Sequence, residues 1–287
     1  MRPDVAAFHD PATGTWSYVV SDPSTRTAAV IDPVLDFDAK AARTTHGSAQ
    51  KLVDHVREHD LDVRWLLETH AHADHLSDAQ WLLERWPGAT VAIGSGIAQT
   101  QRSFAPVFGF GDDVATDGSQ FGRLFEAGDR FAIGGIDADV IGAPGHTADC
   151  VAYRIGDALF CGDTLFMPDS GTARTDFPNA DAATLYRTIQ SFYALPDDTR
   201  VFVCHDYGPN GRAPACETTI GAQKRENIHL RADTTEAEYV ALRQARDATL
   251  PMPALILPSL QVNLLAGALP PTSGNGTRYL RIPLDRI

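Results

Sequence analysis

The sequence predicts an α/β fold in which helices cover layers of β-sheet. Short apolar runs typical of buried strands alternate along the chain with segments of helical periodicity, and several runs end at a histidine or an aspartate. A chain of 287 residues with 44% hydrophobic residues is long enough to bury a large core. We therefore expect layered sheets with helices outside and polar loops gathered at one sheet edge.

The first half of the chain begins with a predicted hairpin and continues as alternating helices and strands. In chain order, the predicted elements are strands at 15–22 and 27–33, a helix at 48–59, a strand at 63–69, a helix at 76–86 and a strand at 90–95. Ser48 and Ser77 are the expected N-caps, and the Pro87-Gly88 pair ends the second helix. The polar, glycine-rich residues 109–122 are predicted to be a loop.

The second half continues the alternation. Strand-like runs occupy 131–144, 150–163 and 200–206, and a helix at 181–194 is stopped by Pro196. A further helix over 235–250 leads into a proline-containing aliphatic stretch, 251–271, which we expect to be an extended tail that packs on the body or, equally, covers a dimer partner. The predicted organisation is a catalytic domain over 1–235, with residues 236–287 packed on that same domain.

Composition excludes several classes of partner. Lys and Arg number 24 against 37 Asp and Glu, giving a net charge of −13, and no basic run occurs. Nucleic acid and anionic membrane are therefore not expected partners. The N-terminus lacks a continuous apolar segment, which predicts a cytoplasmic protein. The four cysteines show no C-x-x-C spacing and are expected to be free, mostly buried thiols.

Ligand-type side chains are concentrated in residues 69–76, THAHADHL, which contain His70, His72, Asp74 and His75. In an extended segment, His70 and His72 project to the same side because they are two residues apart. Single ligands follow later strands: His146 in PGHT, Asp163 in CGDTLF and His205 in CHDYG. A lone histidine is more often an ordinary loop residue, but the recurrence after strands favours a metal site. Imidazole and carboxylate without thiolate suit Zn, Fe, Mn or Ni.

These motifs, in this order, resemble the metallo-β-lactamase superfamily. The resemblance covers about residues 15–230 and implies a four-layer αββα sandwich with a metal at one edge of the two sheets. The segment GTARTDF, residues 171–177, and the C-terminal tail resemble the persulfide dioxygenase (sulfur dioxygenase) branch, in particular its bacterial β-lactamase-hydrolase-like group. Fold alone does not name the reaction, since the superfamily also contains hydrolases.

The resemblance to this branch implies one Fe(II) per subunit, held by His70, His146 and Asp163. It implies oxidation of glutathione persulfide by O2 and water to sulfite and glutathione, and suggests a homodimer. The remaining ligand-type residues would then surround the iron through hydrogen bonds or hold a second metal; they are His72, Asp74, His75 and His205. Counting ligands from the sequence does not separate one metal from two.

Two alternatives stay open at the level of the sequence. The first is a glyoxalase II-type hydroxyacylglutathione hydrolase with a binuclear Zn or Fe site. In that case His70, His72 and His146 would hold one metal, Asp74, His75 and His205 the other, and Asp163 would bridge them to generate a metal-bound hydroxide. The second is a non-catalytic, metal-dependent sensor.

Candidate substrate contacts are cationic or phenolic. Arg174 is the first choice for shaping the pocket, either by touching the substrate or by pairing with Asp176, and Tyr207 is the second candidate catalytic residue because it follows His205-Asp206. The resemblance implies that Lys224, at a position where similar family members have a basic residue, meets a glutathione carboxylate. Arg225 and Arg212 are weaker candidates for the same task.

Overall fold

Two six-stranded sheets form the centre of the computed structural model, which describes residues 2–111 and 114–286. The first sheet, in spatial order, contains β1 (Asp4–Asp10), β2 (Thr15–Ser21), β3 (Thr27–Ile31), β6 (Asp62–Leu67), β8 (Thr90–Gly94) and β9 (Arg123–Phe125). The second contains β10 (Arg130–Ile133), β11 (Ile136–Gly142), β12 (Val151–Ile155), β13 (Ala158–Phe160), β14 (Arg200–Phe202) and β15 (Glu217–Thr219). Strands β3, β6, β8 and β9 run parallel, whereas most of the second sheet is antiparallel.

Side chains along each strand of the first sheet alternate between its two faces, so this sheet contributes to two hydrophobic cores. In β2, Tyr18 and Val20 point into the core between the sheets, while Val19 points into the core beneath the first helical layer. In β3, Ala29 and Ile31 point inward and Val30 outward. Both faces of these strands are buried, which explains why they read as continuous apolar runs rather than as alternating ones.

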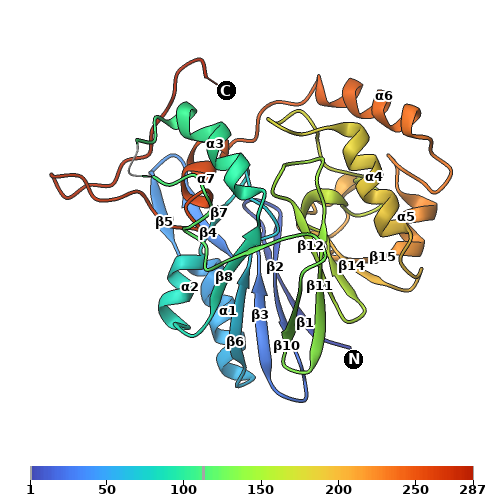
Figure 1. Ribbon diagram of the computed structural model, residues 1–287, viewed down its shortest axis with the longest axis horizontal. Coiled ribbons are helices and arrows are strands. Elements are labelled where there is room, and N and C mark those ends of the chain that lie inside the picture. The colour runs from blue at the N-terminus through green and yellow to red at the C-terminus, as the bar shows by residue number, and fades with distance from the viewer. Residues whose placement is uncertain (1, 112–113, 287) are drawn as a thin grey trace.

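Helices cover the outer faces of both sheets (Figure 1). Those on the first sheet's side are α1 (Gly47–Glu58), α2 (Ala79–Arg85), α3 (Ile97–Phe108) and α7 (Ile256–Asn263), and those on the other side are α4 (Ala182–Tyr193), α5 (Ile220–Glu226) and α6 (Glu236–Asp247). The helices of the first layer contribute Leu52, Phe104 and Leu260 to the core beneath the first sheet. The helices of the second layer contribute Leu185 and Ile189 to the core beneath the second sheet. The predicted αββα sandwich is confirmed. None of the helices within the described residues could span a membrane.

The prediction of an extended tail over 251–271 was wrong, because α7 occupies its centre. Pro258 is only the third residue of α7, a position whose N–H has no intrahelical acceptor, so its ring does not break the helix. The run 131–144 divides at Gly134, which has φ +60° and lies in the turn between β10 and β11. Helices α3 and α5 had not been predicted.

Residues 34–45 form a small hairpin beside the first sheet, so the segment 36–48 consists of most of this hairpin and the start of α1. Strand β4 (Val34–Asp38) pairs with β5 (Arg43–Thr45) and with β7 (Leu76–Ser77), the short strand that follows the histidine-rich segment. A cavity beside this hairpin is lined by Asp38, Arg43 and His75, among others. The hairpin therefore borders the candidate site without contributing a ligand-type histidine.

The C-terminal helices attach to the body through buried polar contacts as well as apolar ones. Arg243 of α6 is 1% exposed, and its guanidinium lies 2.7 Å from Asp247 Oδ1 and donates to the Thr172 carbonyl oxygen at 2.9 Å. Asp247 Oδ2 accepts from the backbone N–H and the hydroxyl of Thr175 at 2.8 and 3.0 Å. Helix α6 thus holds the loop that contains Arg174.

Candidate metal centre

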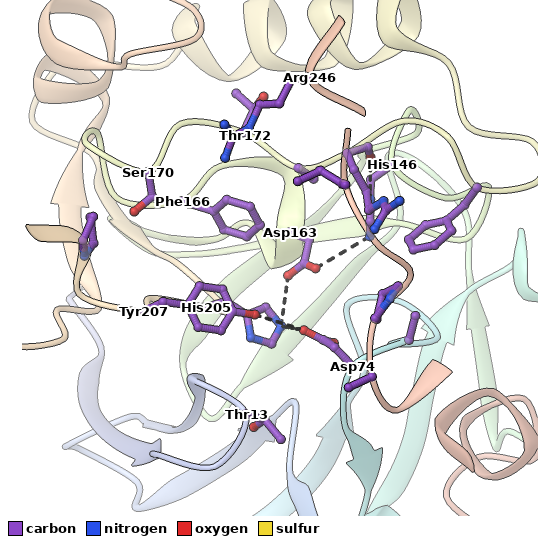
Figure 2. A pocket seen from close by; sticks show the side chains of 18 of the residues that line it. Thr13, Asp74, His146, Asp163, Phe166, Ser170, Thr172, His205, Tyr207 and Arg246 are labelled. Carbon is purple, nitrogen blue, oxygen red and sulfur yellow. Dashed lines mark hydrogen bonds and ion pairs between the residues drawn. The ribbon is translucent and has the colours of Figure 1, made fainter. Parts of the chain in front are cut away.

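The ligand-type residues lie just beyond the ends of neighbouring strands. His70 and His72 follow β6, His146 follows β11, and Asp163 lies in the single turn after β13. His205 follows β14 and forms an isolated bridge with Thr15 of β2. Figure 2 shows Asp163 between His146 and His205, with Asp74 and Tyr207 on the His205 side.

The first group consists of His70, His146 and Asp163, all buried. The Nε2 atoms of the two histidines lie 3.7 and 3.6 Å from Asp163 Oδ2. All three ligand atoms lie within 4.8 Å of one another. Two imidazoles and one carboxylate at this separation can occupy one face of an octahedral metal ion.

A second group lies on the opposite side of Asp163. His205 Nε2 is 3.3 Å from Asp163 Oδ1 and 3.3 Å from Asp74 Oδ2. The rings of His72 and His75 are tilted by 33° with centroids 4.1 Å apart, and the His75 and His205 centroids are 5.5 Å apart. The structure therefore brings together all seven residues that the sequence singled out.

Hydrogen bonds to the outer nitrogens orient these imidazoles. His146 Nδ1 donates to the Arg174 carbonyl oxygen at 2.8 Å, which leaves Nε2 free to face Asp163. His72 Nε2 donates to Asp32 Oδ1 at 3.0 Å and leaves Nδ1 free. His205 Nδ1 lies 3.3 Å from the Thr15 hydroxyl. Fixing one nitrogen in this way is the usual means of aiming the other at a metal.

The inner atoms have no protein partner. Among the described residues, the buried atoms without a hydrogen bond include His70 Nε2, His72 Nδ1, His75 Nε2, His205 Nε2 and Asp163 Oδ1. A buried polar atom without a partner is costly and rare, yet here five of them belong to adjoining groups on the two sides of Asp163. Cations bound in these groups would satisfy them, so the residues fit one or two metal ions, and the cluster is a metal-binding site.

Protonation states support ligation. Burial lowers the pKa values of His70, His72 and His75, and neighbouring imidazoles add to the effect, so these rings are neutral and keep a lone pair for the metal. Burial, reinforced by the Asp74 carboxylate, raises the pKa of Asp163 to about 8. Without a metal, Asp163 is therefore protonated at neutral pH while Asp74, whose pKa is lowered by His205 and His75 despite its burial, is ionised.

Gly145 explains why the PGHT motif needs its glycine. Its φ of +129° is unfavourable for other residues, and a Cβ there would lie 2.4 Å from the backbone of Leu185 in α4. Helix α4 consequently packs directly on the turn that holds His146. A side chain at 145 would displace this histidine from the site.

A cavity of about 580 Å³ opens onto the metal-binding cluster. Its floor includes Asp74, His146, Asp163 and His205, and its walls are formed mainly by the apolar residues Ala73, Phe166, Phe177, Ile228, Leu250, Pro253 and Leu255. The cavity is large enough for a small peptide-sized ligand. A ligand inside it would meet an apolar wall and reach the metal site with one end.

The two candidate catalytic residues both line this cavity. The Arg174 guanidinium pairs with Asp176 at 2.6 Å and donates to the Pro251 carbonyl oxygen at 2.7 Å, so its charge is already neutralised. Tyr207 is 67% exposed at the mouth, with its hydroxyl 3.4 Å from Asp74 Oδ2 and its ring parallel to that of His205. Arg174 thus forms part of the cavity wall, and Tyr207 covers the side of the metal-binding cluster on which Asp74 lies.

The expected substrate contacts of Lys224, Arg225 and Arg212 are not supported, since none of the three lines the cavity. Lys224 on α5 pairs with Asp197 at 2.5 Å, and Arg225 pairs with Glu226 at 3.6 Å. Arg212 pairs with Asp169 and Asp206. All three cations are close in sequence to motif residues, but Lys224 and Arg225 on α5 and Arg212 after the turn at 209–211 each pair with carboxylates and do not line the cavity themselves.

Three residues near the site escaped the sequence analysis. Asp32 directly follows β3 and accepts a hydrogen bond from His72. Its sequence signal was the same as that of the other ligand-type residues, an acid directly after a buried strand. Arg246 of α6 lines the cavity, and Asn263 of α7 contacts the histidine-rich segment. Neither of these two belongs to a recognisable motif, so only the fold reveals them.

The four cysteines are free thiols, as expected. Cys150, Cys161 and Cys204 are buried and Cys216 is half-buried. Burial raises the pKa of Cys161 to about 12, which keeps it a neutral thiol.

Comparison with known proteins decides the family. The family model of the metallo-beta-lactamase superfamily matches residues 10–205, which contain all seven ligand-type residues. The chain belongs to the metallo-β-lactamase superfamily. In fold, it is similar to the crystal structure of ETHE1 from Myxococcus xanthus, with a TM-score of 0.73 and 30% identity, over 92% of this chain and 100% of that one.

Members of this superfamily that are similar in sequence carry different names. A beta-lactamase hydrolase-like protein of Agrobacterium fabrum is 52% identical over 99% of this chain, which spans 65% of that relative's length. Glyoxylase B2 of Dictyostelium discoideum is 43% identical, over 99% of this chain and 97% of its own. The human mitochondrial persulfide dioxygenase ETHE1 is 26% identical, over 92% of this chain and 89% of its own.

The raised pKa of Asp163 predicts that metal binding becomes weaker as the pH falls below about 8. Below that pH the metal must displace a proton from Asp163, so the apparent affinity should fall by up to about tenfold per pH unit. Titration calorimetry with Zn²⁺ at pH 7, in two buffers of different ionisation enthalpy, should show proton release. An affinity that stays constant between pH 6.5 and 8.5 would contradict this assignment.

Proposed function

We propose that the protein is a persulfide dioxygenase with a mononuclear non-haem Fe(II) held by His70, His146 and Asp163. The observation that carries the proposal is the buried group of two histidines and one carboxylate, in a fold similar to that of a bacterial ETHE1 over its whole length. The human protein of that name is a persulfide dioxygenase. Such a ligand set leaves three positions of an octahedral iron open.

Bound there, Fe(II) would supply a site where a soft sulfur anion and O2 can react. In the overall reaction, glutathione persulfide, O2 and water give glutathione, sulfite and two protons. The terminal sulfur is oxidised, O2 is reduced, and the sulfur–sulfur bond is broken with glutathione thiol as the leaving group. The chain's task is to hold the sulfur at the floor of the cavity while the apolar walls exclude other reductants.

The cavity has one cation available for the carboxylate of such a ligand. Of the arginines that line it, Arg174 is neutralised by Asp176 and Arg243 by Asp247. Within the described part of the chain, no carboxylate forms an ion pair with Arg246. Figure 2 shows Arg246 near Thr172, at the end of the cavity opposite Thr13 and with Asp163 between. In a protein of net charge −13, this arginine is the local attraction for an anionic substrate.

A hydrolase of the glyoxalase II type is the second candidate. The observation in its favour is the group of Asp74, Asp163 and His205, which overlaps through His205 with a second group of His72, His75 and Cys204. These residues could hold a second metal. A relative named glyoxylase B2 is 43% identical. Bound there, two metals would supply the Lewis acidity that thioester hydrolysis needs, and the same cavity would accept the glutathione moiety.

Oxygen uptake tests the proposal directly. The protein reconstituted with Fe(II) should consume O2 when glutathione persulfide is added and release sulfite, whereas the zinc-loaded protein should not. Hydrolysis of S-lactoylglutathione, measured in parallel with both metals, should be slow by comparison. Rapid thioester hydrolysis without iron-dependent O2 uptake would instead establish the hydrolase.

Metal content distinguishes one metal from two. Asp163→Ala removes a ligand of the proposed iron and should abolish iron binding, whereas His205→Ala should leave most of the iron in place. Inductively coupled plasma mass spectrometry of the purified variants measures both. Equal losses of metal in the two variants would support a binuclear site and argue against the mononuclear one.

Arg246→Gln should raise KM for glutathione persulfide while kcat stays near the wild-type value. Loss of one charged hydrogen bond costs about 1.5–3 kcal/mol, which corresponds to roughly a 10–100-fold higher KM. Arg231→Gln is the matched control, because Arg231 is an exposed arginine that does not line the cavity. The same KM in both variants would exclude Arg246 as the carboxylate contact.

A further inference from the structure

The segment from α6 onward lies outside the residues matched by the family model, 10–205, yet it contacts both sides of the metal-binding cluster. We propose that this C-terminal segment positions the metal ligands, through Asn263 on one side and Asp247 on the other. Both act through the backbone of the loops that carry the ligands. With one metal at His70, His146 and Asp163, the Asp247 side acts on a ligand and Asn263 acts on the residues that surround the metal; with two metals, both sides act on ligands.

Asn263 holds the histidine-rich turn at three points. Its side-chain amide donates to the carbonyl oxygens of His72 and His75, each at 2.8 Å. Its Oδ1 accepts from the backbone N–H of Ser77, also at 2.8 Å. Asn263 is 4% exposed, so these hydrogen bonds do not compete with water.

The chemistry of the turn requires an amide at this position. Two carbonyl oxygens need donors and one N–H needs an acceptor, and an asparagine side chain supplies both kinds of group. An aspartate keeps the acceptor but replaces the donor with a negatively charged oxygen facing two carbonyls. The turn between His72 and Ser77 includes Asp74 and His75, so its conformation determines where these side chains point.

Asp247 acts on the opposite side. It accepts two hydrogen bonds from Thr175 and pairs with the buried Arg243, which itself donates to the Thr172 carbonyl oxygen. The loop held in this way contains Arg174, whose carbonyl oxygen accepts from His146 Nδ1 at 2.8 Å. The direction of the His146 ring is therefore set by a contact that begins in α6.

A purely structural role for α7 has to be separated from positioning. Ile256 and Leu260 bury the helix in the core beneath the first sheet, so any damage to α7 lowers stability. Gln261 provides the matched control on the same helix. It is 2% exposed and also makes three hydrogen bonds, to the Leu257 carbonyl oxygen and to the backbone of Arg281, but none to the histidine-rich turn.

The experiment compares Asn263→Asp with Gln261→Glu in the full chain. Affinity for Zn²⁺ is measured by competition with a chromophoric chelator, and the visible spectrum of the Co²⁺-loaded protein reports the geometry around the metal. Loss of an orienting contact typically weakens metal binding by about 10–100-fold. We expect that loss, and an altered cobalt spectrum, for Asn263→Asp alone, with Gln261→Glu retaining wild-type affinity and spectrum.

Equal effects on metal affinity in the two variants would show that α7 contributes only stability and would overturn the proposal. So would an Asn263→Asp variant with wild-type affinity and spectrum. Should Asn263→Asp fail to fold, Asn263→Ala removes the same donor without adding a charge and is measured in the same assays. None of these readouts depends on oxygen uptake, so failure here is distinguishable from failure of the proposed dioxygenase activity.

Discussion

The carboxylate of Asp163 lies between two groups of histidines, with His70 and His146 near one oxygen and His205 near the other. Each of these groups is buried, and the inner nitrogens of His70 and His205 have no hydrogen-bond partner within the described residues. Such crowding would oppose folding if nothing compensated it. A cation bound beside Asp163 would satisfy these ligand atoms and offset that cost, and the surrounding loops hold the ligand side chains in place through hydrogen bonds.

The layers of the fold serve this arrangement in different ways. The two sheets supply rigid strand ends, from which the ligand-bearing loops project into one cavity. The helical layers fix the loops: α4 packs against Gly145 beside His146, and α6 and α7 hold loops on either side through buried polar side chains. The same fold supports many different reactions. In this chain, contacts from residues outside the shared motifs also shape the site.

Sequence reasoning identified the metal-binding residues because their signal is local. Each follows a buried strand within a few positions, and several histidines in one short segment are rare by chance. Helix α7 was missed because its apolar residues face the core and its prolines suggested an irregular tail. Arg246 and Asn263 were missed because their roles depend on contacts with residues far away in the chain. The prediction that Lys224 contacts the substrate relied on its closeness to a motif in sequence. In the fold, Lys224 pairs with Asp197 and lies outside the cavity wall.

The hydrogen bonds of Asn263 also bear on the order of events during synthesis. The turn that carries His72 and His75 is made early, but the residue that holds it is made nearly two hundred positions later. A nascent chain that ends before α7 lacks the three hydrogen bonds that Asn263 makes to this turn, and contacts of such long sequence separation form slowly. The turn can therefore acquire the hydrogen bonds described here only after α7 has been translated.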